Sequence, residues 1–305
     1  MSNTLITILG PTATGKTTFA ANLAAEIGGE IISADSRQVY KGMDIGTGKD
    51  LADYIVDYKV IPYHLVDIKE PGYEYNVFEY QKDFINVFND IIARKKIPIL
   101  CGGTGLYLES VIQMYSMHNV PENKELREHL SKKDDQELID ILTSMKALHN
   151  VSDISDRKRL VRAIEIQFHQ IECPDEILEF PDYKSLVFGI SFDRQIIRER
   201  ITNRLKTRLE KEGMLDEIRM LLNTGLKADQ LTFYGLEYRY LTEHITGKLS
   251  YEEMFTKLNT AIHQFAKRQM TWFRRMEKRG TKIHWIDGEM DLIEKVKAVR
   301  LRIKN

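Results

Sequence analysis

The chain has 305 residues, 43% of them hydrophobic, and this length predicts about two domains with a sizeable core. Lys and Arg number 44 against 45 Asp and Glu, so the net charge of −1 gives no global signal for nucleic acid, and any such interface must be local. Two cysteines, Cys101 and Cys173, are too few for a disulfide framework or an all-cysteine zinc site. The sequence begins without a basic leader and has no apolar run of about 18 residues, which predicts a cytoplasmic protein that does not contact a membrane.

The first predicted elements are a strand over residues 5–9 and a helix over residues 18–27, joined by a glycine-containing loop. The loop reads Gly10, Pro11, Thr12, Ala13, Thr14, Gly15, Lys16 and Thr17. In such a loop the backbone N–H groups and the positive end of the helix stabilise a phosphate chain, the lysine adds a cation, and the threonine hydroxyl can hold Mg²⁺. A plain Gly-rich turn is the alternative, but the flanking strand and helix favour a di- or triphosphate site.

The following residues alternate between strand and helix patterns. We predict a strand over residues 30–33, a polar loop over 34–49, a helix over 80–93, a strand over 97–101, and a helix that opens at residues 102–105. This alternation is typical of a parallel sheet with right-handed crossovers. Ligands of such sheets bind at the carboxyl ends of the strands.

Helical patterns replace the strand signal between residues 119 and 184, at 124–131, 136–145 and 157–168. A strand over 185–190 then resumes the α/β pattern, followed by helices near 195–224, 237–246, 251–278 and 290–301 and a strand over 282–286. We therefore predict an α/β fold, with a P-loop-type parallel sheet core flanked by helices and an inserted all-helical domain. The core would comprise residues 1–118 and 185–305, and the insertion residues 119–184.

A phosphate-binding loop is compatible with nucleotide hydrolases, small-molecule kinases and transferases that release diphosphate. A hydrolase requires a strand that ends in a Mg²⁺-binding aspartate, whereas the strand over 97–101 ends in Gly102, Gly103 and Thr104. The strand over 30–33 is followed by Asp35, which the sheet edge would place beside the loop as a general base. A turn-forming or helix-capping aspartate is the alternative, and these residues alone leave both open.

Five segments, in chain order, resemble the bacterial tRNA dimethylallyltransferases. They are the loop at 10–17, ISADSRQVYKGMDIGT at 32–47, PYHLVD at 62–67, GGTGLY at 102–107 and KRQMTWFR at 267–274. The resemblance extends from residue 4 to about 287. It implies transfer of a dimethylallyl group from dimethylallyl diphosphate to N6 of the tRNA adenosine just 3′ of the anticodon (position 37), with Mg²⁺ as cofactor.

The resemblance also implies roles for individual residues. Asp35 would accept a proton from the adenine amine, and Lys16, Thr17 and Thr104 would complete the catalytic group. Residues 10–17 would hold the diphosphate, with Thr17 as the metal ligand. The target base would lie against Asp35, Ser36, Arg37, Gln38 and Thr104, and a glutamine amide suits paired hydrogen bonds to an adenine edge.

The target base must leave the stacked anticodon loop, at a cost of about a few kcal/mol, so the RNA needs a separate binding surface. The resemblance places that surface on Arg127, Lys158, Arg159, Leu160, Val161 and Arg162. Further tRNA or phosphate contacts are expected at Tyr238, Arg239, Lys267, Arg268 and Gln269. Two more basic stretches, residues 194–208 and 267–279, fit RNA phosphates, although an isolated basic run is more often a solvated helix face.

Other residues receive more ordinary roles. Trp272 and Phe273 lie on a long amphipathic helix and are expected in the core rather than stacked on bases. His64 has no second ligand at metal spacing, which favours a structural role or a weak contribution to the active site.

The chain departs from the family at two places. Glu237 stands where the family has the glycine of a Gly-Tyr-Arg or Gly-Tyr-Lys motif, and Ile262 to Gln264 stand where it has Thr-Arg-Gln. The alternatives are an isopentenyltransferase of free AMP or ADP, a P-loop nucleoside or metabolite kinase, and a non-catalytic RNA-binding protein. Our leading prediction is a monomeric enzyme whose partners are tRNA and dimethylallyl diphosphate.

Overall fold

A computed structural model describes residues 3–145, 156–173 and 178–304. The chain forms two compact units, one of residues 1–114 and 181–305 and the other of residues 115–180. The boundaries of the second unit thus lie a few residues before the predicted limits of 119 and 184.

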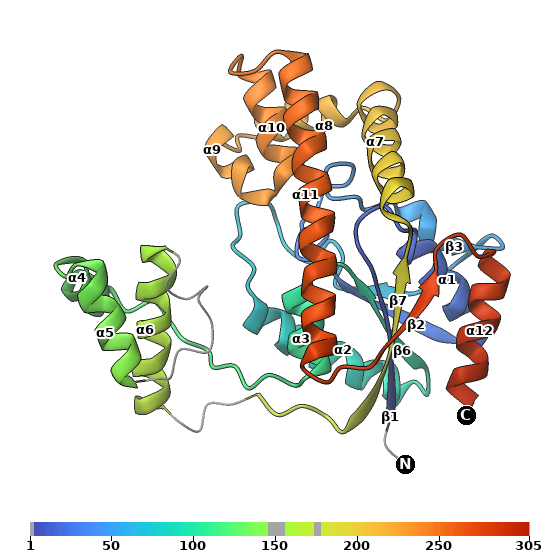
Figure 1. The fold of residues 1–305 in the computed structure, drawn as a ribbon, viewed down its shortest axis with the longest axis horizontal. Coiled ribbons are helices and arrows are strands. Elements are labelled where there is room, and N and C mark those ends of the chain that lie inside the picture. The colour runs from blue at the N-terminus through green and yellow to red at the C-terminus, as the bar shows by residue number, and fades with distance from the viewer. Residues whose placement is uncertain (1–2, 146–155, 174–177, 305) are drawn as a thin grey trace. The chain divides into compact units, whose positions relative to one another are not determined.

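The first unit is built on a six-stranded parallel sheet with the order β5-β2-β6-β1-β7-β8 (Figure 1). The strands are β1 (Asn3–Leu9), β2 (Gly29–Ala34), β5 (Tyr63–His64), β6 (Ile97–Gly102), β7 (Tyr183–Ser191) and β8 (Ile283–Asp287). The predicted parallel α/β core is therefore confirmed. The sequence analysis missed β5, because two residues are too few to show a strand pattern.

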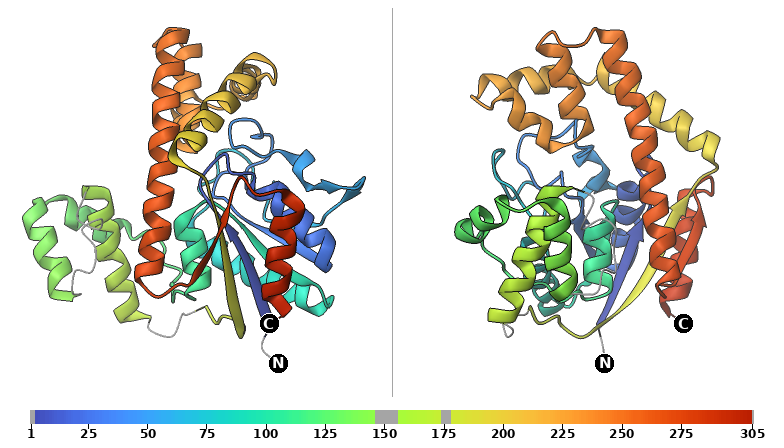
Figure 2. Two further views of the ribbon diagram at one scale, coloured as in Figure 1. Left: turned by 45° about the vertical axis from the view of Figure 1, so that its right-hand side comes forward. Right: turned by 60° about the vertical axis from the view of Figure 1, so that its left-hand side comes forward.

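Helices cover both faces of this sheet, which explains why its central strands are continuous apolar runs. One face carries α1 (Lys16–Ile27) and α12 (Leu292–Lys304), and the other carries α2 (Val77–Ala93) and α3 (Gly105–Ile112) (Figures 1 and 2). On the α1 side, Ile6 and Ile8 pack in one cluster with Phe19 of α1 and Val299 of α12. A short turn (Leu51–Tyr54) leads into a small antiparallel hairpin of β3 (Ile55–Val56) and β4 (Lys59–Val60).

A group of helices follows β7 in the same unit. It comprises α7 (Arg194–Glu210), α8 (Met214–Asn223), α9 (Ala228–Leu231), a single turn at Thr232–Tyr234, α10 (Leu236–Ile245) and α11 (Tyr251–Lys278). The long helix α11 packs against α10, α7 and α3 (Figure 2). The prediction of one helix over 195–224 was wrong, because Gly213 has a φ of 75° and this left-handed conformation separates α7 from α8.

The second unit contains α4 (Lys124–Ser131), α5 (Asp135–Met145) and α6 (Arg157–Glu172). Asn123 and Asp156 cap α4 and α6, each accepting a hydrogen bond from a backbone N–H in the first turn. Leucines from all three helices meet with Ile164 in a separate core. The three predicted helices are confirmed, and α6 extends beyond the predicted end at residue 168.

Candidate active site

The phosphate-binding loop joins β1 to α1 at the carboxyl edge of the sheet. The backbone of the loop turns sharply, and Ala13 and Gly15 adopt left-handed φ values of 64° and 75°. The Thr14 hydroxyl and the Lys16 ammonium both donate to the carbonyl oxygen of Pro11, over 2.9 and 2.8 Å. Residues 12–17 line a cavity of about 990 Å³. Gly10 and Pro11, although predicted to touch diphosphate, are buried and are not among the lining residues.

Asp35 lies directly after β2 and lines the same cavity. Its Oδ1 accepts the backbone N–H of Arg37 over 2.9 Å, which fixes the carboxylate beside the strand end. Burial raises the pKa of Asp35, while the Arg37 N–H and the charge of Lys16 oppose that rise. Burial also lowers the pKa of Lys16 to about 8, and the charge of Asp35 opposes that shift. The predicted base and the predicted phosphate-binding cation therefore face one cavity and interact electrostatically.

The other predicted base contacts also line this cavity, at the ends of β2 and β6. The Thr104 hydroxyl accepts the backbone N–H of Ser36 over 3.1 Å and so ties the two strand ends together. The side-chain amide of Gln38 bonds to Ser33 and to the carbonyl of Gly48. The Arg37 guanidinium lies 5.2 Å from the centroid of the Phe233 ring, another lining residue.

Three arginines of α7 point at the loop and the cavity, and they recur every four residues on one helix face. Arg200 donates to the carbonyl of Ala13 over 2.9 Å, and Arg204 donates to the Thr12 hydroxyl over 2.5 Å. Arg208 is buried and pairs with Asp50, with its NH2 2.7 and 2.8 Å from the two carboxylate oxygens. The sequence analysis assigned them only to a basic stretch that fits RNA phosphates, although their four-residue spacing is the signal that would have placed them together on one helix face.

Helix α11 supplies the remaining wall. Arg268 lines the cavity, whereas Lys267 is exposed and is not a lining residue. Gln269 is buried, with its amide oxygen and nitrogen bound to the main chain of Thr12 and Gly103. The prediction that Trp272 is a core residue was wrong in part: its ring lines the cavity, while Phe273 is buried as predicted.

Two expected tRNA contacts in the first unit behave differently. Tyr238 is fully buried and donates its hydroxyl hydrogen to Glu217 over 2.7 Å, so the prediction that it touches RNA or phosphate was wrong. Tyr238 is buried because it lies on the packed face of α10, where Gly46 lies against its ring. Arg239, the next residue, is exposed and lines the cavity.

The predicted RNA-binding residues of the second unit fall into three kinds. Lys158 and Arg159 are exposed on α6. Arg127 and Arg162 both bind the carboxylate of Glu165, whose side chain is only 1% exposed. Leu160 is 2% exposed in the core of the unit and Val161 packs against that core. Contact of these two residues with RNA stays a prediction.

Some cavity residues carried no recognisable sequence signal. Asp53 and Phe233 reach the cavity from the single helical turns at Leu51–Tyr54 and Thr232–Tyr234, and Asp50 directly precedes the first of these turns. Glu237 also lines it, and burial raises the pKa of this carboxyl group while Arg204 and Arg208 oppose the rise. His64 instead bonds to Glu30 over 2.8 Å and is not among the cavity residues, which supports its structural role.

The cavity wall offers an oxygen donor that suits a magnesium ion. No group of three or more His, Cys, Asp or Glu side chains in the described part of the chain is arranged to hold a metal ion. Mg²⁺ needs few protein ligands, because substrate phosphates and water complete its coordination. The Thr17 hydroxyl, on the cavity wall at the start of α1, is a suitable oxygen donor for such an ion.

Within the residues that the structure covers, no helix is both long and apolar enough to span a membrane.

Comparisons with known proteins agree with this geometry. Residues 38–276 match the family model described as IPP transferase, and residues 3–61 match that of isopentenyl transferase. The chain is 57% identical over 300 residues to tRNA dimethylallyltransferase 2 of Bacteroides fragilis, covering 98% of both chains. It is 58% identical over 302 residues to tRNA dimethylallyltransferase 1 of Parabacteroides distasonis, covering 99% of this chain and 97% of that one.

A solved structure is similar along the whole chain. The tRNA isopentenylpyrophosphate transferase of Bacillus halodurans has a TM-score of 0.72 and 30% identity, with 99% of this chain and 96% of that chain covered. A eukaryotic dimethylallyltransferase acting on tRNA shares the fold, with a TM-score of 0.78 at 24% identity over 99% of this chain and 78% of that chain. Since close relatives match over nearly their full length, the chain belongs to the tRNA dimethylallyltransferase family of prenyltransferases.

Proposed function

We propose that this protein transfers the dimethylallyl group of dimethylallyl diphosphate to N6 of the adenosine just 3′ of the anticodon (position 37) in tRNA. The observation that carries the proposal is the meeting of the phosphate-binding loop and Asp35 in one cavity of a chain from this family. In the reaction the allylic C–O bond breaks, a C–N bond forms, and diphosphate leaves. One proton passes from the amine to a base.

The loop is suited to the leaving group. Its backbone and the start of α1 present N–H groups to a cavity that Lys16 and Arg268 also line. Arg200 and Arg204 contact the loop itself, so cationic charge surrounds the place where diphosphate charge develops. A Mg²⁺ ion held by Thr17 would add neutralising charge to the leaving group.

Asp35 is suited to take the proton. An exocyclic adenine amine is a weak nucleophile, so removal of its proton as the C–N bond forms lowers the barrier. Burial raises the pKa of Asp35 above its ordinary value, which makes its carboxylate a stronger base than an exposed aspartate. Ser36, Gln38 and Thr104 surround it on the cavity wall and are the candidate contacts of the base.

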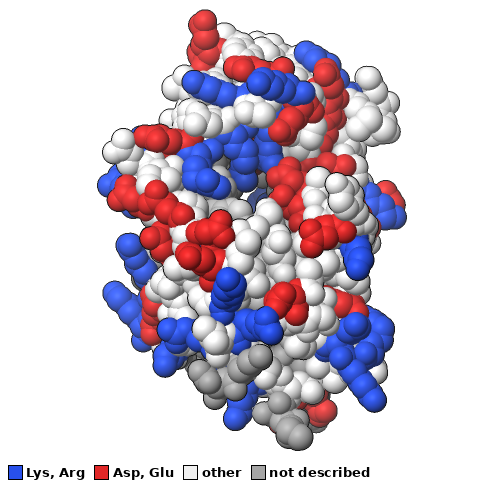
Figure 3. All heavy atoms as spheres, turned by 90° about the vertical axis from the view of Figure 1, so that its right-hand side faces the viewer, with Lys and Arg blue, Asp and Glu red and all other residues white. Residues whose placement is uncertain are grey.

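Phosphates of the RNA would bind exposed basic residues, with Lys158 and Arg159 as the candidates in the second unit. Figure 3 shows one face of the molecule, on which Lys and Arg side chains gather around a hollow with acidic side chains beside them. Such local clusters allow a nearly neutral protein to bind RNA in a salt-dependent way. Monomeric assembly and a cytoplasmic location stay predictions.

The test is to mix the purified protein, Mg²⁺ and dimethylallyl diphosphate with an anticodon stem-loop that carries adenosine at the target position. We expect the RNA to gain the mass of one dimethylallyl group, and no gain would contradict the proposal. Free AMP and ADP serve as parallel acceptors, and faster reaction with them would favour the free-nucleotide isopentenyltransferase. ATP consumption stimulated by a small acceptor, without a prenyl donor, would instead indicate a kinase.

A further inference from the structure

The side-chain amide of Gln38 is held at both ends, by Ser33 of β2 and by the backbone carbonyl of Gly48. Its oxygen accepts a hydrogen bond from the hydroxyl of Ser33 over 3.3 Å, and its nitrogen donates to the backbone carbonyl of Gly48 over 3.2 Å. Ser33 is buried in β2, whereas Gln38 is half-buried and lines the cavity. The amide thus sits between a fixed strand and the loop that carries Gly48.

These partners allow only one orientation of the amide. A backbone carbonyl can accept but not donate, so the NH₂ end must face Gly48. The oxygen end consequently faces Ser33, whose hydroxyl can donate to it. A primary amide has two N–H donors and two acceptor directions, and each contact uses one of them. One donor and one acceptor direction therefore remain for a ligand.

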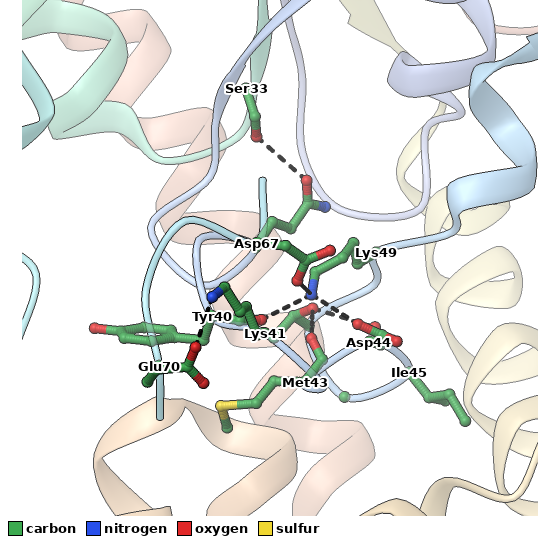
Figure 4. Close-up of polar contacts among 12 residues, drawn as sticks. Ser33, Tyr40, Lys41, Met43, Asp44, Ile45, Lys49, Asp67 and Glu70 are labelled. Carbon is green, nitrogen blue, oxygen red and sulfur yellow. Dashed lines mark hydrogen bonds and ion pairs between the residues drawn. The ribbon is translucent and has the colours of Figure 1, made fainter. Parts of the chain in front are cut away.

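The loop that carries the Gly48 carbonyl is held in place by several hydrogen bonds to buried side chains. One oxygen of the buried Glu217 carboxylate accepts the backbone N–H groups of Asp44 and Ile45, over 2.9 and 2.7 Å, and the other accepts that of Gly46 over 3.0 Å. Beside them the buried ammonium of Lys49 binds Asp44, Asp67 and the carbonyl of Tyr40 (Figure 4). The Gly48 carbonyl is therefore held in position, and it can hold the Gln38 amide in position in turn.

We propose that Ser33 and the Gly48 carbonyl lock the Gln38 amide in the orientation that reads adenine, which makes Ser33 a positioning residue for base selection. This inference rests on the proposed function. Adenine offers an N6–H donor beside a ring-nitrogen acceptor, and these match the remaining acceptor and donor of the locked amide. Guanine has the O6 acceptor where adenine has N6–H, and a free amide would turn over to match it. The second N6 hydrogen is left for Asp35.

The test compares stem-loops with adenosine, 1-deazaadenosine or 7-deazaadenosine at the target position. Each analogue keeps the reacting amine but lacks one ring nitrogen that the amide can bind. For the wild-type enzyme we expect kcat/KM to fall about fivefold or more with one of the two analogues, as for the loss of one hydrogen bond. In Ser33→Ala the ratio of kcat/KM for adenosine to that for the same analogue should fall below about twofold, because the amide keeps only its contact with Gly48 and can swing out of the position that binds the base.

Glu217→Gln is a second test variant, because a neutral amide holds the three loop N–H groups less well than the carboxylate does. It should also reduce the ratio of kcat/KM for adenosine to that for the analogue. Thr7→Val is the matched control. Thr7 is a buried residue of the same sheet, and its hydroxyl has no hydrogen-bond partner among the described residues. Its removal should leave the ratio unchanged.

Each result decides between named alternatives. If Ser33→Ala slows adenosine and analogue equally, so that the wild-type ratio persists, Ser33 has only a structural role and the inference fails. It also fails if the wild-type enzyme shows no loss with either analogue. If the wild-type enzyme does not modify the adenosine stem-loop, the proposed function itself is contradicted.

Discussion

The side-chain oxygen of Gln269 accepts a hydrogen bond from the backbone N–H of Thr12 over 2.8 Å. These residues lie near opposite ends of the chain, on α11 and in the phosphate-binding loop. The amide nitrogen of the same glutamine donates to the carbonyl of Gly103 over 2.8 Å, at the end of β6. One buried side chain of α11 therefore connects the loop to a neighbouring strand end and sets the shape of the phosphate-binding edge.

Replacing this glutamine should weaken both the fold and donor binding. We expect Gln269→Ala to lower the free energy of unfolding by roughly 1–3 kcal/mol, because the partly buried N–H of Thr12 and the buried C=O of Gly103 lose their partner. It should also raise the KM for dimethylallyl diphosphate, as the loop loses its anchor. Chemical denaturation and steady-state kinetics measure the two effects. Gln264→Ala, on an exposed position of the same helix, should change neither, and an unaltered KM in Gln269→Ala would argue against the anchoring role.

The charge of Lys16 should set the alkaline limit of activity. Burial lowers its pKa to about 8, so the free enzyme loses this cation as the pH rises through that value. We expect kcat/KM for dimethylallyl diphosphate to fall above about pH 8. The fall in kcat should come at higher pH, since bound diphosphate stabilises the charged form. Lys16→Arg should abolish the alkaline fall in kcat/KM, and the same fall in this variant would assign it to another group.

Lys158 should contribute to RNA affinity through its charge alone. It is exposed on α6, so its removal costs little packing. We expect Lys158→Ala to weaken binding of the stem-loop and to reduce the slope of log K against log salt by about 1. Titrations at several salt concentrations measure the slope. Lys132→Ala, an exposed lysine of the same unit, is the control, and equal slopes for wild type and Lys158→Ala would exclude a phosphate contact.

Glu165 should stabilise the second unit in a pH-dependent way. Its carboxylate binds Arg127, Arg162 and the backbone N–H of Asn123, and these contacts hold its pKa below the ordinary value of 4.5. The stabilisation is thus present above that value and is lost as the pH falls through the lowered pKa. We expect Glu165→Ala to reduce the free energy of unfolding at pH 7 by roughly 2–3 kcal/mol. Chemical denaturation of wild type and Glu165→Ala at pH 7 and in acid measures the stabilisation and its loss at low pH. A Glu165→Ala variant as stable as wild type at pH 7 would refute the prediction.

Local sequence patterns were sufficient for most of the fold. The apolar runs at 5–9 and 97–101 became central strands because both of their faces are covered, and such runs are recognisable without tertiary information. The join between α7 and α8 was missed because its clearest sign in the sequence is a single glycine, Gly213, which adopts a left-handed conformation between the two helices. Strand β5 exists only through its pairing with β2, which no local pattern reveals.

The active site was predictable where chain neighbours build it and not where distant segments meet. Residues 10–17 and Asp35 follow their strands directly, so the sheet edge brought them together as expected. Whether a residue such as Leu160 or Tyr238 faces solvent depends on which side of its helix is packed, and the motif alone does not state this. The contacts of Arg204 and Gln269 with Thr12 span most of the chain and required the structure.

The central claim is that Asp35 takes the proton while the loop holds the leaving diphosphate. Single-turnover formation of the modified stem-loop by Asp35→Asn, with both substrates saturating, tests it most directly. The account predicts a rate lower by about 10²-fold or more, with dissociation constants for stem-loop and inorganic diphosphate within about threefold of wild type. A wild-type rate in this variant, or a slow rate explained wholly by lost binding, would contradict it.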